Sequence, residues 1–150
     1  MNKILKPFRR LLNPDVTSTD LAAFVKSSSQ TTGVLFILIS GNNNDLNDAF
    51  SKIQDTAKIH NARFMEVLSG LFQYLVEDNE ESRLEGKCKF LADDIMAKIG
   101  KRGVIVWTVQ TVRVGSWGGP DFVHYGAMVP NFQEIMGKLS NAIQGEIIAI

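Results

Sequence analysis

The sequence predicts one α+β domain in which helices pack on a mainly antiparallel sheet. Three observations support this prediction: a continuous apolar run near residue 35, two short apolar segments joined by a Ser-Gly turn, and apolar residues at helical spacing on either side of that pair. A strand–helix–hairpin–helix–strand order is the ferredoxin-like arrangement. The elements that give this order are expected at residues 33–40, 44–60, 62–68, 71–77, 82–99 and 103–115.

The first elements follow from apolar patterning and turn residues. The run 33–40 begins with a glycine and is apolar almost throughout, which is typical of a buried central strand. Asn44 or Asp45 can cap the next helix, whose apolar residues share one side. The Ser69-Gly70 pair between the next two apolar segments predicts a tight hairpin.

The second half of the chain continues the alternation of helix and strand. Apolar residues recur at helical spacing over 82–99, and the β-branched stretch 103–115 predicts one bent strand. The glycine-rich stretch GSWGGP is expected to form a loop with Trp117 at its tip, where the ring either folds back or serves as a binding anchor. A strand, a helix and a last strand are expected at residues 121–125, 130–141 and 145–150.

Residues 1–30 are expected to form a helical extension, and residues 31–150 the domain itself. Five large apolar side chains fall on one face of the first helix, with four cations elsewhere on the wheel. Exposing them to water is unfavourable, so we expect the helix to dock on its own domain or on a protein partner. An anionic membrane surface is the alternative partner for a basic amphipathic helix. The apolar residues are Ile4, Leu5, Phe8, Leu11 and Leu12.

Composition and charge exclude several classes of protein. The 150 residues suit one domain, and the net charge is zero. The first ten residues hold four of the 16 basic side chains and no acidic one, which leaves 12 basic and 16 acidic residues in the remainder, a charge of −4. A nucleic-acid-binding body should instead be basic. The single cysteine, Cys88, cannot form an internal disulfide, and no apolar run approaches the ~20 residues of a membrane span, so we expect a cytoplasmic protein.

Three stretches of the sequence resemble, in order, the catalytic domain of class III adenylyl and guanylyl cyclases. They are VLFILISG, LNDAFSKIQDTAKIHNARFMEVLSGLFQYLVED and VRVGSWGGPDFVHYGAMVPNFQEIMGKLSNAIQGEIIAI. The resemblance spans about residues 33–150 and implies a nucleotidyl-cyclase-like sheet. It rests on the order and spacing of turns, glycines and apolar positions: Gly41, Phe50, His60, Arg63, Gly115, Gly118, Tyr125, Gly126, Leu139, Gly145 and Glu146.

The resemblance also implies where cyclase chemistry would lie. The two aspartates that hold the metal ions fall on Leu38 and Gly70. The base-reading pair falls on Glu66 and Val123, and Glu66 matches the glutamate that guanylyl cyclases use. The ribose asparagine falls on Pro130, one place before Asn131, and the arginine on Glu134. The sequence therefore predicts a domain with no catalytic residues, metal or cofactor.

Other candidate sites have simpler explanations. The asparagines and aspartates at 42–48 lack the register of a calcium loop and suit turns and caps. His60 and His124 have no ligand spacing around them, and Cys88 lies on an apolar helix face, as core cysteines do.

We therefore expect a homodimerising interaction or regulatory module in signalling. A ligand sensor with a remnant nucleotide pocket and an active cyclase are the alternatives. The candidate interface residues are the five apolar residues of the first helix together with Trp117 and Phe122.

Overall fold

The computed structural model describes residues 28–68, 70–119 and 122–150. The expected extension, with Ile4, Leu5, Phe8, Leu11 and Leu12, lies outside these residues. The elements are β1 (Ser28–Ile39), α3 (Asn43–Ile59), β2 (Arg63–Leu68), β3 (Leu71–Val76), the short 3-10 helix η2 (Glu81–Arg83), α4 (Leu84–Ile99), β4 (Gly103–Gly119), β5 (Phe122–Met128), α5 (Phe132–Asn141) and β6 (Ile147–Ala149).

The strands form one sheet in the order β2-β3-β1-β4-β5, with β6 also paired to β4. The neighbours on the main path are antiparallel, and β6 runs parallel to β4. The sheet therefore confirms the predicted α+β, mainly antiparallel fold. Strand β4 pairs with three other strands: β1 along one of its edges, and β6 and β5 along successive parts of its other edge.

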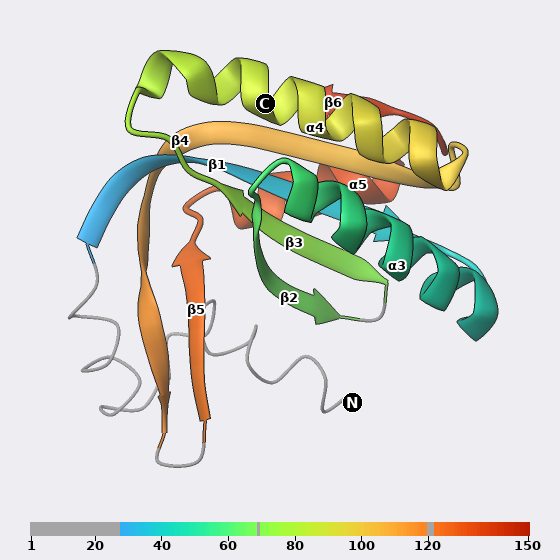
Figure 1. Cartoon of the computed structure of the whole chain (residues 1–150), viewed down its shortest axis with the longest axis horizontal. Helices are drawn as coiled ribbons and strands as arrows, with labels where there is room; N and C mark the ends of the chain where they lie inside the picture. Colours follow the sequence, from blue (N-terminus) through green and yellow to red (C-terminus); the bar gives the residue numbers. More distant parts are fainter. Residues whose placement is uncertain (1–27, 69, 120–121) are drawn as a thin grey trace.

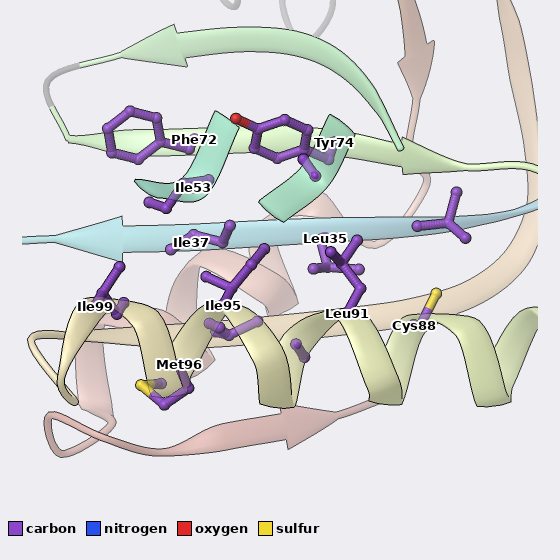
Figure 2. Close-up of a cluster of buried hydrophobic side chains, with 14 of the residues drawn as sticks. Leu35, Ile37, Ile53, Phe72, Tyr74, Cys88, Leu91, Ile95, Met96 and Ile99 are labelled. Atoms are coloured by element: carbon purple, nitrogen blue, oxygen red, sulfur yellow. The ribbon is translucent and has the colours of Figure 1, made fainter. Parts of the chain in front are cut away.

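Helices cover both faces of the sheet. Alternate residues of β1 point to opposite faces and therefore join different clusters. Leu35 and Ile37 join one buried cluster with residues of α3 and α4, and Figure 2 shows these side chains meeting Leu91 and Ile95 of α4. Val34 and Phe36 join a second cluster with α5. The two core helices share one face, as the ferredoxin-like arrangement requires, and α5 covers the other.

Cys88 lies in the core, as predicted. It is fully buried on α4, and burial, with a smaller contribution from Glu85, raises the pKa of its thiol to about 12. A Cβ added at Gly33 of β1 would lie 2.3 Å from Cys88 Sγ. The absence of a side chain at Gly33 therefore lets α4 approach the sheet closely at this point.

The structure corrects the boundaries of two strands. Strand β1 begins at Ser28 rather than at residue 33, because β4 pairs with it along its whole length, from Ser28–Val114 to Ile39–Gly103. The expected glycine-rich loop is instead the end of β4, which reaches Gly119 and pairs with β5. In Figure 1 the paired ends of β4 and β5 run away from the helices as a long hairpin.

Candidate functional site

The end of β1 brings together the two positions at which the resemblance places metal ligands. Leu38 pairs in register with Leu71, the residue after Gly70, and the N–H of Ile39 donates to the Gly70 carbonyl oxygen at 2.8 Å. Leu38 is half-buried and packs against the second cluster. The two positions thus lie next to each other, but Leu38 offers only a hydrocarbon side chain and Gly70 none.

Gly70 is packed so tightly that no larger residue fits its present backbone. Its φ is +89°, a region that side-chain-bearing residues rarely adopt. A Cβ there would lie 2.4 Å from the Ile39 carbonyl oxygen, a backbone atom that cannot swing aside. The turn between β2 and β3 is therefore built around the absence of a side chain.

The N-terminus of α3, which follows β1, carries its own carboxylate. Asn42 is the N-cap: its Oδ1 accepts from the Asp45 N–H at 3.0 Å, and its own N–H donates to Asp45 Oδ2 at 3.4 Å. The cap is thus Asn42, not the predicted Asn44 or Asp45. A helix N-terminus attracts anions through its free N–H groups and dipole. Here the Asp45 carboxylate already places a negative charge in the first turn of α3. A Cβ at Gly41 would lie only 2.9 Å from Asp45 Oδ2.

The start of α5 holds the positions aligned with the cyclase asparagine and arginine. Pro130 and Glu134 are both exposed. Asn131, the next residue after Pro130, turns its side chain inward, where its Oδ1 accepts from Gln110 Nε2 at 2.7 Å. Gln110 also donates to Thr108 Oγ1 at 3.2 Å. Asn131 therefore ties α5 to β4 and is not free to orient a ribose.

Glu134 lines a shallow hollow of about 370 Å³ together with Lys138 and Glu146. Of these three charged side chains two are carboxylates and one is a cation, so the lining is acidic on balance.

The two positions aligned with the base-reading pair lie on edge strands: Glu66 on β2 and Val123 on β5. Their side chains are not among those that the structure describes. Glu66 is opposite Gln73 in the β2–β3 register, and Val123 is opposite Gly118 in the β4–β5 hairpin. Gln73 could not be singled out from the sequence, because it is one polar residue inside an apolar strand. It is 5% exposed, and its Nε2 has no hydrogen-bond partner in the described structure.

The two candidate interface residues in the second half of the chain lie in strands. Trp117 pairs with His124, and Phe122 pairs with Gly119. The prediction that Trp117 occupies a loop tip is wrong, because β5 provides a partner for each residue of the glycine-rich stretch up to Gly119. The structure places the backbone of both residues in the projecting hairpin (Figure 1).

The polar residues at 42–48 act as caps and ion pairs. Besides the cap at Asn42, Asp48 accepts from Arg102 Nη2 at 2.7 Å and pairs with Lys52 at 3.2 Å. The hydrogen bond from Arg102 contributes most to holding the pKa of Asp48 below its usual value, and the bond from Lys52 contributes next. No group of three metal-ligating side chains occurs within the described residues. No helix in that part of the chain is long and apolar enough to cross a membrane.

Solved structures with the same arrangement are nucleotidyl cyclase domains. The adenylyl cyclase CyaB from P. aeruginosa matches with a TM-score of 0.69 and 11% identity, covering 83% of this chain and 78% of that one. The guanylate cyclase domain of RhGC from Catenaria anguillulae, in complex with GTP, matches with 0.65 and 14%, covering 80% and 78%. The chain has the fold of a class III nucleotidyl cyclase catalytic domain.

A third structure with this cyclase fold is the monomeric guanylyl cyclase domain of the RhoGC fusion protein from the aquatic fungus Blastocladiella emersonii. Its TM-score is 0.63 at 13% identity, covering 81% of each chain. No protein-family model and no curated protein matches the sequence. At these identities the cyclase fold is shared, and the chemistry must be argued from the residues of this chain.

Proposed function

We propose that this chain is a non-catalytic domain with the cyclase fold, which works as a homodimerising interaction or regulatory module in signalling. The observation that supports this most directly is the turn at Gly70. A position that would need a metal-binding carboxylate has no room for any side chain beside the Ile39 carbonyl oxygen. The proposal places the module in the cytoplasm, since its single cysteine, Cys88, is buried and has no internal partner.

The chemistry of cyclisation supports the same proposal. Displacement at phosphorus depends on divalent metal ions that neutralise the phosphate oxygens, and such ions prefer carboxylate ligands. Leu38 and Gly70 offer no side-chain oxygen at the aligned positions. Asp45 at the start of α3 and Glu134 on α5 add negative charge. The phosphate oxygens would therefore meet added negative charge, and the aligned positions supply no side chain to hold the metal ions.

Calorimetry with nucleotides tests this proposal. We expect no metal-dependent binding of ATP or GTP in the presence of Mg²⁺ or Mn²⁺, because no carboxylate pair holds the ions. A metal-dependent dissociation constant below ~100 μM for either nucleotide would contradict it. The same titrations without metal provide the baseline, since binding that persists unchanged there does not use a metal site.

A ligand sensor is the second candidate, and Gln73 favours it. Its buried Nε2 has no hydrogen-bond partner among the described side chains. It lies on β3 opposite Glu66 of β2, whose aligned position reads the base in cyclases. A carboxylate can accept from the N1–H and amino groups of guanine, while an amide can donate to O6. If the domain is such a sensor, guanosine binds in the absence of metal and adenosine does not. Glu66→Gln then abolishes the binding of guanosine. Equal, undetectable heats for guanosine and adenosine would remove this candidate.

A homodimer is the expected state in solution, because cyclase domains build their sites between two copies. Light scattering at ~100 μM protein should give twice the monomer mass of 16.6 kDa. Charge introduced in the β4–β5 hairpin by Trp117→Glu or Phe122→Glu should lower the mass. Ile143→Glu, which adds the same charge at an exposed site after α5, serves as the control. A wild-type mass of one chain would refute the homodimer.

A further inference from the structure

Strand β1 is longer than the strand that pairs with one of its edges. Its pairing with β4 runs from Ser28 to Ile39, whereas its pairing with β3 begins only at Gly33, opposite Val76, the last residue of β3. In Figure 1 the blue start of β1 extends beyond the end of β3. Within the described residues, the stretch 28–32 therefore has a strand along one edge and none along the other. We call this second edge the open edge of β1.

The open edge carries backbone groups that can pair with a further strand. The N–H of Ile39 donates to the Gly70 carbonyl oxygen, on the side of β1 where β3 lies. The β1–β4 register is unbroken, and a regular strand turns the backbone groups of successive residues to alternate edges. Every second residue back from Ile39 therefore faces the same side. Ser29 and Thr31 belong to this series, so their N–H and carbonyl groups face the open edge, where an added strand can bind them.

A polar hollow of about 690 Å³ lies beside the open edge. It is lined by Gln30, Thr31 and Thr32 of β1 and, across from them, by residues between Glu77 and Lys87. Thr32 is 1% exposed, and its Oγ1 has no hydrogen-bond partner in the part of the chain that the structure describes. A buried hydroxyl without a partner is unusual, because it loses the hydrogen bonds that water gave it. The hollow thus combines room for a ligand with a polar group that lacks a partner.

The charges around the hollow favour a cationic ligand. Three carboxylates and two cations line it. Both cations are already paired, Lys87 with Asp78 at 2.6 Å and Arg83 with Glu80 at 3.3 Å. Glu81 makes no ion pair with any other described residue. Its carboxylate is therefore available to a positive charge that a ligand brings.

We propose that the open edge of β1 is a docking site for an extended basic peptide of a partner protein. The peptide adds a strand beside Ser29 and Thr31 and places a lysine or arginine side chain near Glu81. The site lies at the opposite end of β1 from Leu38, so the proposal depends neither on the cyclase-aligned positions nor on homodimerisation.

A basic segment of a partner fits the charge of the hollow better than a hairpin formed by the residues just before Ser28. Residues 18–27 hold one cation, Lys26, and one anion, Asp20, so they bring no net charge to the carboxylates. A partner strand with lysine or arginine at alternate positions brings positive charge and a free backbone edge together.

Amide hydrogen exchange of the full chain, followed by NMR, tests where the peptide binds. The probe is a peptide of alternating threonine and lysine, capped at both ends and used at low salt, where charge contacts are least screened. We expect a dissociation constant below ~1 mM. The peptide should slow exchange of the Ser29 and Thr31 amide protons by at least about tenfold. A peptide with glutamate in place of lysine should bind at least about fivefold more weakly.

Two N-methylated versions of the lysine peptide test whether it binds as a strand. One is methylated on its odd-numbered amides and the other on its even-numbered amides, so each loses the donors of one edge. A strand added to β1 pairs through one edge only, so the two versions should differ in affinity by at least about tenfold.

A pair of charge reversals tests the role of Glu81. Glu81→Lys should weaken binding of the lysine peptide by at least about threefold. Asp93→Lys makes the same change of charge at an exposed site on α4 that does not line the hollow. It should leave the affinity within about twofold of the wild-type value.

The proposal is refuted if exchange at Ser29 and Thr31 does not respond to the lysine peptide at ~1 mM. Amide protons that are already protected there, by residues 1–27 or by a second copy of the chain, would give this result. The proposal is refuted equally if the two N-methylated peptides bind alike, or if Glu81→Lys and Asp93→Lys weaken binding to the same extent.

Discussion

Replacing Gly70 with aspartate is expected to destabilise the domain by about 3 kcal/mol or more, which lowers Tm by roughly 6–12 °C. A non-glycine residue at φ +89° is strained, typically by about 1–2 kcal/mol. The remainder comes from the Ile39 carbonyl oxygen, which the new Cβ would approach to 2.4 Å unless the backbone of β1 moved. Adding Leu38→Asp to restore both cyclase carboxylates should therefore give a less stable protein and no cyclase turnover.

The Gly70 prediction has a matched control on α4. Gly86 is exposed, and a Cβ there would meet no atom within 4 Å. Gly86→Ala should raise stability slightly, since alanine favours a helix by about 0.5–1 kcal/mol over glycine. Thermal unfolding followed by circular dichroism checks both variants. An unchanged Tm for Gly70→Asp would mean that the turn can accept a side chain, and the structural support for a non-catalytic site would be lost.

Gly33→Ala is expected to cost about 1–3 kcal/mol, because it overfills the contact between β1 and α4. The added methyl would lie 2.3 Å from Cys88 Sγ and 3.1 Å from Val76 Cβ. Cys88 is fully buried, so its sulfur cannot turn out into solvent without leaving the core. Cys88→Ala removes the sulfur, so the double variant Gly33→Ala/Cys88→Ala should recover much of the lost stability.

Urea unfolding of the wild type, Gly33→Ala, Cys88→Ala and the double variant measures the coupling between the two substitutions. The two substitutions together should cost less than the sum of their separate effects, by about 0.5–3 kcal/mol. Cys88→Ala alone should be mildly destabilising, because it leaves a small cavity. Additive costs would show that α4 is not held against Gly33 by this contact.

The order of elements was predictable because each carries its own local signal. The apolar run around Phe36, the Ser69-Gly70 turn and the spacing from Leu84 to Ile99 each state their secondary structure without help from distant residues. The full length of β1 and β4 was not predictable. The polar residues 28–32 and the glycines near 118 favour loops by composition, and only pairing with a strand far along the chain makes them extended.

The candidate site was predictable as a set of positions but not as geometry. The resemblance located Leu38 and Gly70, and the structure places them side by side. The N-cap was placed two or three residues too late, since any of three asparagines can cap this helix and the choice among them depends on where β1 ends. The contact of His60 Nε2 with Asp94 Oδ2, at 2.9 Å, was not predictable from the sequence either, because 34 residues separate the partners.

The pairing of β1 with β4 has a consequence for how the chain folds. Ile39 is matched with Gly103, 64 positions later, and Ser28 with Val114, 86 positions later, so the two longest strands meet only after a loop of more than 60 residues has closed. Such long-range pairing is slow, because the entropy of closing the loop is lost before the contacts form. During synthesis at about 5–20 residues per second, β1 therefore waits several seconds for the strand that completes it. Over that interval its apolar residues need cover from β3 and α3, which makes this N-terminal half the natural place for folding to begin.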